Sequence, residues 1–212
     1  MGRAMAKWRH PLLVLLLGLS VWSFWESLCA VEVKEPLTGA AFPQEMGKQQ
    51  LVASGVRRKY GLKVYAVAFY LDGSSRLWGP SGHVTARRVV KEAPGRASLR
   101  IVITSSLVTK QKLSQGLRES LRPRLLNLVQ LAEAEEVLQE FEEALAKGPP
   151  LKRGTELVFT LKQSGLRLQM GKRYAAEIAG KAIVEALLAT YVDAKAVAPE
   201  FKEHIFQGLA RK

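Results

Sequence analysis

The stretch Leu51–Gly73, LVASGVRRKYGLKVYAVAFYLDG, reads as two β-strands joined by a tight turn. The first strand, up to Arg57, is mostly small and apolar, whereas the second, Leu62–Leu71, is rich in valine, tyrosine and phenylalanine, which favour strands. Gly61 lies between them and can adopt the positive φ that a short turn requires. The pattern predicts a central β-hairpin.

The side chains of the second predicted strand divide between two faces, because successive side chains of a strand point in opposite directions. One face should carry Tyr65, Val67 and Phe69, and the other Val64, Ala66, Ala68 and Tyr70. The doublet Arg57-Arg58 ends the first strand and divides in the same way, so that one arginine reaches water and the other points under the sheet. Because burying a lone charge is costly, an inward arginine must be paired or must wait for an anion.

Composition is that of an ordinary globular protein, with 48% hydrophobic and 24% charged residues among 212. The formal net charge of +13 raises the question of an anionic partner such as nucleic acid or a membrane surface. The basic residues form no dense block, however, and RNP-like, zinc-finger and helix-turn-helix patterns are absent. We therefore expect no nucleic-acid binding.

Residues 1–30 differ from the rest and have the layout of a signal peptide or targeting leader. A positive start (Arg3, Lys7, Arg9) precedes the apolar run Leu12–Trp25, which is shorter than the roughly 20 residues of a membrane span. We expect a secretory or extracytoplasmic destination, with a plastid as the alternative. Cys29 is the only cysteine, so residues 31–212 contain no thiol, disulfide or cysteine metal site.

The remaining chain predicts further strands and helices in a single domain, residues 31–212. The expected strands are Val31–Lys34 at an edge, then Ala97–Thr104, Glu156–Lys162, Leu166–Met170 and Arg173–Ile178. The expected helices are Thr85–Glu92, Thr109–Leu121 (with Pro123 interrupting it before Leu125–Leu131), Glu133–Lys147, Lys181–Val192 and Pro199–Leu209. This order favours an α+β fold, in which helices stack on one face of an antiparallel sheet.

Motifs of known chemistry are missing. The three histidines (His10, His83 and His204) are scattered, and no hydrolase, metalloprotease, dinucleotide or phosphate-loop pattern occurs. Six glutamates between positions 133 and 143 are best explained as the solvated face of an amphipathic helix rather than a metal site. We expect no metal and no cofactor.

Several segments together resemble the chalcone isomerase superfamily. They are Glu35–Gly39 with Phe42-Pro43, Ala53–Arg57, Lys63–Leu71, and Gly180–Ile183 through Ala189–Val192 to Ala196–Pro199. The similarity covers about Val31–Leu209. It implies an open-faced β-sandwich, in which an antiparallel sheet packs against a layer of helices and a ligand cleft lies between the two layers.

The resemblance implies one of two activities. Chalcone isomerases cyclise a hydroxychalcone to a flavanone, with an arginine of the first hairpin steadying the phenolate and hydroxyl groups polarising the ketone. Chalcone isomerase-like members instead bind fatty acids, with the same arginine and a tyrosine of the next strand holding the carboxylate.

Matched position by position, Arg57 falls on the family arginine, and Tyr65 falls where isomerases carry threonine and fatty-acid binders tyrosine. Ser120 lies near an asparagine of the isomerase cleft, and Thr190 matches a polar specificity position. Near Lys112, where isomerases place a catalytic tyrosine, the chain has none. The resemblance thus implies Arg57, Tyr65, Thr190 and Ser120 as ligand-binding residues, and Arg57, Tyr65 and Thr190 as catalytic residues of an isomerase.

The missing tyrosine argues against cyclisation, and the presence of Arg57 and Tyr65 favours a non-catalytic binder of a fatty acid or similar apolar carboxylate. We expect a monomer. The alternatives are an isomerase (intramolecular lyase) acting on a chalcone-like enone, and a ligand-free scaffold for another enzyme. Structural roles are open as well: Arg57 pairing with Glu177, Tyr65 bonding the backbone, and Thr190 satisfying a helix carbonyl.

Overall fold

The computed structural model describes residues 31–80 and 84–211. The predicted leader, residues 1–30, and His83 lie outside this part of the chain. The segment Glu32–Lys212 forms one compact unit with its own core, so we expect it to fold by itself. None of the helices in the described part combines the length and the apolar character that crossing a membrane requires.

Within the described residues, seven antiparallel strands form the main sheet in the order β3-β4-β5-β6-β7-β8-β9. They are β3 (Glu45–Met46), β4 (Gln49–Lys59), β5 (Leu62–Asp72), β6 (Ala97–Ile103), β7 (Glu156–Leu161), β8 (Gly165–Met170) and β9 (Tyr174–Ala179). The strand expected near Val31–Lys34 is β1 (Glu32–Lys34), which pairs with β2 (Ala41–Pro43) in a separate small sheet.

The predicted hairpin is confirmed as β4 and β5, the second and third strands of the sheet. Tyr60 and Gly61 make its turn with φ of 52° and 76°, and the two positive values match a two-residue type I′ turn. The predicted faces are confirmed for most of β5: Tyr65 belongs to the main core, whereas Tyr70 packs with Phe42 in a second cluster on the other face of the sheet. The prediction was wrong for Val64, which packs against the main core and lines the same cavity as Tyr65.

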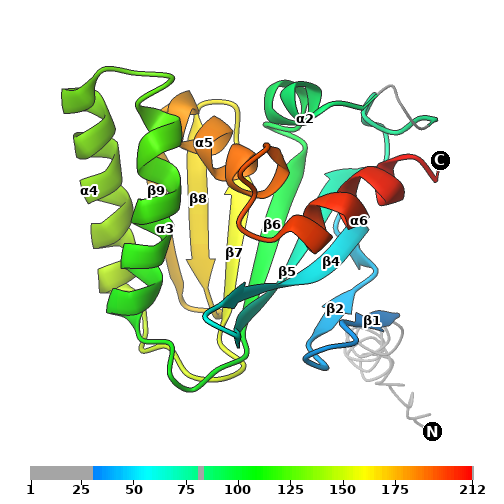
Figure 1. Ribbon diagram of the computed structural model, residues 1–212, viewed down its shortest axis with the longest axis horizontal. Helices are drawn as coiled ribbons and strands as arrows, with labels where there is room; N and C mark the ends of the chain where they lie inside the picture. The colour runs from blue at the N-terminus through cyan, green and yellow to red at the C-terminus, as the bar shows by residue number, and fades with distance from the viewer. Residues whose placement is uncertain (1–30, 81–83, 212) are drawn as a thin grey trace, which may run out of the picture. The chain divides into compact units, whose positions relative to one another are not determined.

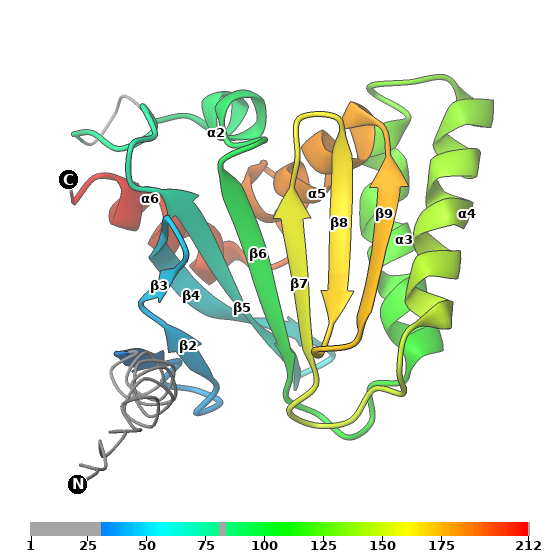
Figure 2. The ribbon, with the colours of Figure 1, turned by 180° about the vertical axis from the view of Figure 1, so that it is seen from behind.

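The helices of the described part lie on one face of the curved sheet, and the view from behind shows the other face without a helical layer (Figures 1 and 2). They are α2 (Ala86–Glu92), α3 (Lys110–Leu125), α4 (Leu131–Lys147), α5 (Lys181–Val192) and α6 (Pro199–Leu209). The α+β class and the open-faced arrangement are therefore confirmed. α4 runs beside the edge strand β9, where the Tyr174 hydroxyl donates to the Ala144 carbonyl.

Two helix boundaries were predicted wrongly. α3 continues through Pro123 to Leu125, because the proline lies in the last turn and removes only one backbone hydrogen bond. The fully buried Leu121 and Leu125 on either side hold this turn against the core. The predicted continuation Leu125–Leu131 is wrong, since residues 126–129 form turns and a bend between α3 and α4. α4 begins at Leu131, two residues before the predicted start.

α6 packs so closely on β4 that two glycines are required at the contact. A Cβ built on Gly208 would overlap the Val52 carbonyl oxygen, and one on Gly55 would lie 2.7 Å from the Cβ of Phe201. This contact fixes β4, and with it Arg57, against the helical layer.

We therefore expect Gly208→Ala to lower the free energy of unfolding by about 1–3 kcal/mol, because backbone atoms must separate to admit the methyl group. Urea denaturation of the purified protein measures the change. Gly73→Ala is the control, since its Cβ would lie at an ordinary 3.6 Å from the nearest atoms of Gln50. Equal stability of the two variants would contradict the close contact.

Candidate ligand-binding site

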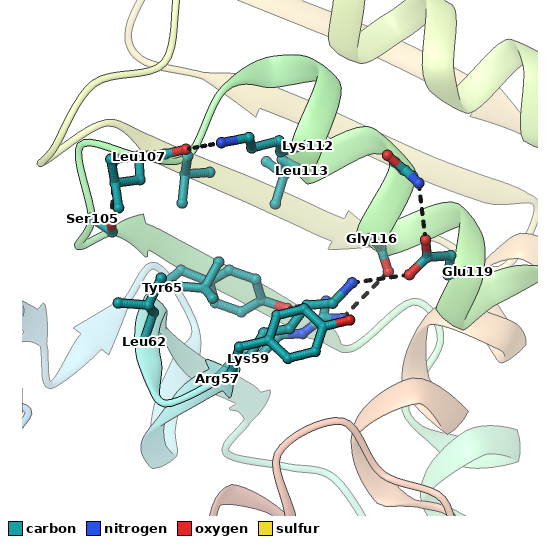
Figure 3. A pocket seen from close by; sticks show the side chains of 14 residues that line it. Arg57, Lys59, Leu62, Tyr65, Ser105, Leu107, Lys112, Leu113, Gly116 and Glu119 are labelled. Atoms are coloured by element: carbon teal, nitrogen blue, oxygen red, sulfur yellow. Dashed lines mark hydrogen bonds and ion pairs between the residues drawn. The ribbon is translucent and has the colours of Figure 1, made fainter.

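A cavity of about 410 Å³ lies between the tip of the β4–β5 hairpin, the loop after β6 and the N-terminal half of α3 (Figure 3). Its apolar lining consists of Leu62, Val64, Leu107, Val108 and Leu113. Its polar lining consists of Arg57, Lys59, Tyr60, Tyr65, Ser105, Lys112, Gln115 and Glu119, with Gly116 between them. The walls thus combine an apolar patch with polar and charged side chains, and small-molecule sites likewise combine the two.

Arg57 is the inward member of the arginine doublet, with 8% of its surface exposed, and Arg58 is the exposed member. Its Nη1 donates to the Tyr65 hydroxyl at 3.3 Å, and its Nη2 donates to Gly116 O and Ser120 Oγ, both at 3.4 Å. These distances exceed the roughly 2.7–2.9 Å of charge-assisted hydrogen bonds. These contacts hold the guanidinium in place, but they are long enough that it can still donate shorter hydrogen bonds to a ligand.

Among residues 31–80 and 84–211, no carboxylate oxygen lies within 4.0 Å of the Arg57 guanidinium. The alternative of an Arg57–Glu177 pair is wrong, because Glu177 pairs with Lys162 at 2.8 Å. Glu119, the carboxylate in the cavity wall, pairs with Lys59 at 3.0 Å (Figure 3). Arg57 is therefore a buried charge without a protein counterion in this part of the chain.

The guanidinium nevertheless remains charged. Burial by itself lowers the pKa of Arg57, whereas the hydroxyl groups of Tyr65 and Tyr191 and the more distant Glu119 raise it. The net effect is a pKa above the ordinary value. A permanent positive charge thus faces the cavity.

Tyr65 connects Arg57 to helix α5 through a pair of phenols. Its hydroxyl lies 2.7 Å from the hydroxyl of Tyr191, and either oxygen can be the donor. Burial, reinforced by the neighbouring Tyr65, raises the pKa of Tyr191 well above its ordinary value, so this phenol stays neutral. When Tyr191 donates to Tyr65, the Tyr65 proton is free to be donated into the cavity.

A family model described as chalcone isomerase-like matches residues 37–206. The chain belongs to the chalcone isomerase-like family. Among solved structures, it is similar to the fatty-acid binding protein AtFAP1 of Arabidopsis thaliana, with a TM-score of 0.70 and 18% sequence identity. That match covers 85% of this chain and 98% of the Arabidopsis chain. No curated protein sequence matches.

The chalcone isomerase-like fold brings together three of the four predicted site residues. Arg57 and Tyr65 line the cavity. Ser120 does not line it, but its Oγ accepts a hydrogen bond from Arg57 and donates one to Gly116 O at 2.8 Å. Thr190 is not part of the lining: it is fully buried, and its hydroxyl donates to Ala186 O at 2.9 Å. The structural alternative for Thr190, a bond to a helix carbonyl, is the one observed.

The sequence analysis missed two residues of the site. Tyr191 was predicted only as an inward side chain, although a buried tyrosine needs a partner for its hydroxyl. Gly116 contributes its carbonyl, which accepts from Arg57 Nη2, and a Cβ there would lie at an ordinary 3.8 Å from that nitrogen. A glycine inside a predicted helix was the signal that could have drawn attention to this position.

Within the described ranges, no group of three or more histidine, cysteine, aspartate or glutamate side chains could hold a metal ion. The glutamates of α4 instead form ion pairs, such as Glu142 with Arg118 at 2.9 Å and Glu135 with Arg122 at 2.6 Å. Their interpretation as a solvated face therefore fits the structure. What the cavity offers chemically is a buried cation (Arg57) beside a buried phenol (Tyr65), with an apolar wall and further polar groups in the lining.

A buried charge without a counterion should contribute nothing to stability. We expect Arg57→Met to unfold with a free energy equal to that of the unchanged protein or up to about 2 kcal/mol higher. Arg124→Met is the matched control, because Arg124 is similarly buried but binds both carboxylate oxygens of Asp193, at 2.8 and 2.9 Å. Its loss should cost about 2–3 kcal/mol.

Urea denaturation of both variants provides the comparison. If Arg57→Met destabilises the protein as much as Arg124→Met does, Arg57 has a structural partner and is not waiting for an anion.

Proposed function

We propose that this chain binds a fatty acid or a similar apolar carboxylate without transforming it, and that Arg57 and Tyr65 hold the carboxylate. The observation that carries the proposal is the environment of Arg57. Its buried guanidinium has no carboxylate within 4.0 Å in the described part of the chain, and it faces a cavity with leucine and valine walls.

The headgroup contacts follow from the geometry of the donors. A guanidinium can donate two parallel hydrogen bonds to the two oxygens of a carboxylate. Arg57 can exchange its long contacts to Gly116 O and Ser120 Oγ for shorter ones to such a ligand. Because Arg57 is already desolvated in the folded protein, binding adds no further cost of removing it from water.

The apolar tail of the ligand would contact the side chains of Leu62, Val64, Val108 and Leu113. Each buried methylene group contributes about 0.8 kcal/mol to binding. The cavity volume of about 410 Å³ lies within the range of roughly 300–1,000 Å³ that is usual for small-molecule sites. The similar Arabidopsis structure is that of a fatty-acid binding protein, which further supports this class of ligand.

Cyclisation of a chalcone-like enone is the second candidate, because the charge of Arg57 would also stabilise a phenolate. Two features weigh against it. The lining has lysine at position 112, where isomerases carry tyrosine, and Thr190 does not line the cavity. Fewer hydroxyl groups are therefore available to polarise a ketone. A ligand-free scaffold is the third candidate.

Arg57→Gln is expected to weaken the binding of a fluorescent fatty acid about 10- to 100-fold, because hydrogen bonds to charged groups contribute about 1.5–3 kcal/mol. Fluorescence titration of the Glu32–Lys212 segment measures the affinity. Arg58→Gln is the control, since it removes the exposed neighbour and should leave the affinity unchanged.

Mass spectrometry of the purified protein should also detect co-purifying acyl chains that are lost in Arg57→Gln. A rate of chalcone consumption above the spontaneous reaction would instead establish the isomerase. If neither bound lipid nor chalcone turnover is detected, the ligand-free scaffold is the remaining candidate.

Tyr65→Phe is expected to weaken fatty-acid binding about 10-fold, near the lower end of the roughly 1.5–3 kcal/mol that one hydrogen bond to a charged group contributes. Tyr191→Phe should have a smaller effect, because Tyr191 touches Tyr65 and does not line the cavity. The same titration ranks the two variants. A larger loss in Tyr191→Phe would contradict the assigned role of Tyr65.

A further inference from the structure

Three large apolar side chains are exposed where the cavity opens. Tyr60 is 91% exposed, Leu107 59% and Leu62 51%, and all three also line the cavity. Tyr60 and Leu62 come from the β4–β5 turn, and Leu107 comes from the loop between β6 and α3. A group of exposed apolar side chains at one opening indicates a surface that another phase or molecule covers.

The backbone holds Tyr60 in a strained conformation at the tip of the hairpin. Its φ of 52° lies in the left-handed region, which bulky side chains rarely adopt. The Nζ of Lys59 lies 5.6 Å from the centre of the Tyr60 ring and stacks a cation on it. An aromatic ring presented to solvent by a strained turn suggests a function outside the core.

The same edge of the sheet carries many basic side chains. The register places the β4–β5 turn, the end of β6, the start of β7 and the β8–β9 turn along one edge, the lower edge in Figure 1. The exposed basic residues there, which we call the basic edge, are Arg58, Lys63, Lys112, Lys152, Arg153, Lys172 and Arg173.

The charges of the basic edge are not neutralised by the protein. None of its members has a carboxylate within 4.0 Å in residues 31–80 and 84–211. Lys63 and Lys112 donate to the carbonyls of Leu37 (2.5 Å) and Leu107 (3.3 Å), which orients both amines without cancelling their charge. By contrast, Lys59 is paired with Glu119.

We infer that this edge docks on the surface of an anionic lipid bilayer, with Tyr60, Leu62 and Leu107 inserted among the lipids and the basic edge on the headgroups. Tyrosine prefers the membrane interface, and basic side chains beside apolar ones are typical of proteins that lie on anionic membranes.

The acidic side chains Glu119 and Glu156 at this edge are paired with Lys59 and Arg100, so among the described residues the members of the basic edge leave unpaired charges of a single sign. Such charges match lipid headgroups better than a protein surface, where both signs normally alternate.

Docking in this orientation would place the opening of the cavity against the acyl chains of the membrane. A fatty acid could then pass between bilayer and cavity without crossing water. This transfer of a fatty acid rests on the proposed function, whereas docking on the membrane is measured separately as binding to vesicles.

The test is co-sedimentation of the Glu32–Lys212 segment with phosphatidylcholine vesicles that contain increasing fractions of phosphatidylserine. This segment avoids any contribution of the apolar run at residues 12–25. Binding should rise with phosphatidylserine and disappear near 1 M salt, where the screening length falls to about 3 Å. Absence of binding, or binding that does not depend on phosphatidylserine, would overturn the inference and favour a protein partner.

Charge variants locate the surface. The triple variant Lys152→Gln/Arg153→Gln/Lys172→Gln should bind these vesicles about 100-fold more weakly, because each basic residue near an anionic surface contributes about a fivefold change. The control Arg87→Gln/Lys91→Gln removes exposed charges of α2 at the opposite edge of the sheet (Figure 1) and should bind normally. Equal losses in both would contradict a specific edge.

The apolar contact is tested with Tyr60→Asn, since asparagine tolerates the left-handed backbone of the turn. Vesicle binding should fall about tenfold, whereas Leu128→Asn, which removes an exposed leucine from the α3–α4 connection, should have no effect. The triple charge variant should also retain its affinity for the fluorescent fatty acid, and Arg57→Gln should retain vesicle binding. These two results separate failure of docking from failure of the proposed ligand.

Discussion

The candidate site depends on a positive charge that is buried and has no carboxylate partner in the described part of the chain. Arg57 is taken out of water by the packing of β4 against α3 and α6, yet its contacts to Tyr65, Gly116 and Ser120 are all neutral and long. Burying a charge in this way lowers the free energy of unfolding, and the packing of the surrounding core offsets that loss. The close contact of Gly208 with Val52 matters for this reason: it keeps the strand in place while its arginine remains available.

Much of the fold could be predicted from the sequence, because strand periodicity and turn chemistry are local. The two faces of β5 follow from alternation alone over most of the strand, and Gly61 marks the turn. Pro123 misled the prediction, because the cost of a proline depends on its distance from the end of the helix, and that end is fixed by packing of Leu125.

The site was only partly predictable. Arg57 and Tyr65 lie opposite each other in neighbouring strands and were found from the family pattern, whereas the partner of Tyr65 is 126 residues away in the chain. Thr190 and Tyr191 are adjacent on α5 but point in directions about 100° apart, as neighbours on a helix do. Which of the two faces the cavity side of the sheet depends on how the helix packs, and no local pattern determines that.

The outer strands of the sheet have a consequence for solubility. β3 is only two residues long, and α4 runs beside β9, where Tyr174 bonds to Ala144. Unpaired strand edges are the usual starting points of intermolecular β-pairing and amyloid growth. Here β3 pairs only with the first residues of β4, and α6 covers β4 beyond them, where His204 Nδ1 lies 3.1 Å from Ser54 O. In the described part of the chain, both edges of the main sheet, β4 beyond β3 and β9, are thus covered by helices, which hinders the pairing of these strands with those of another copy.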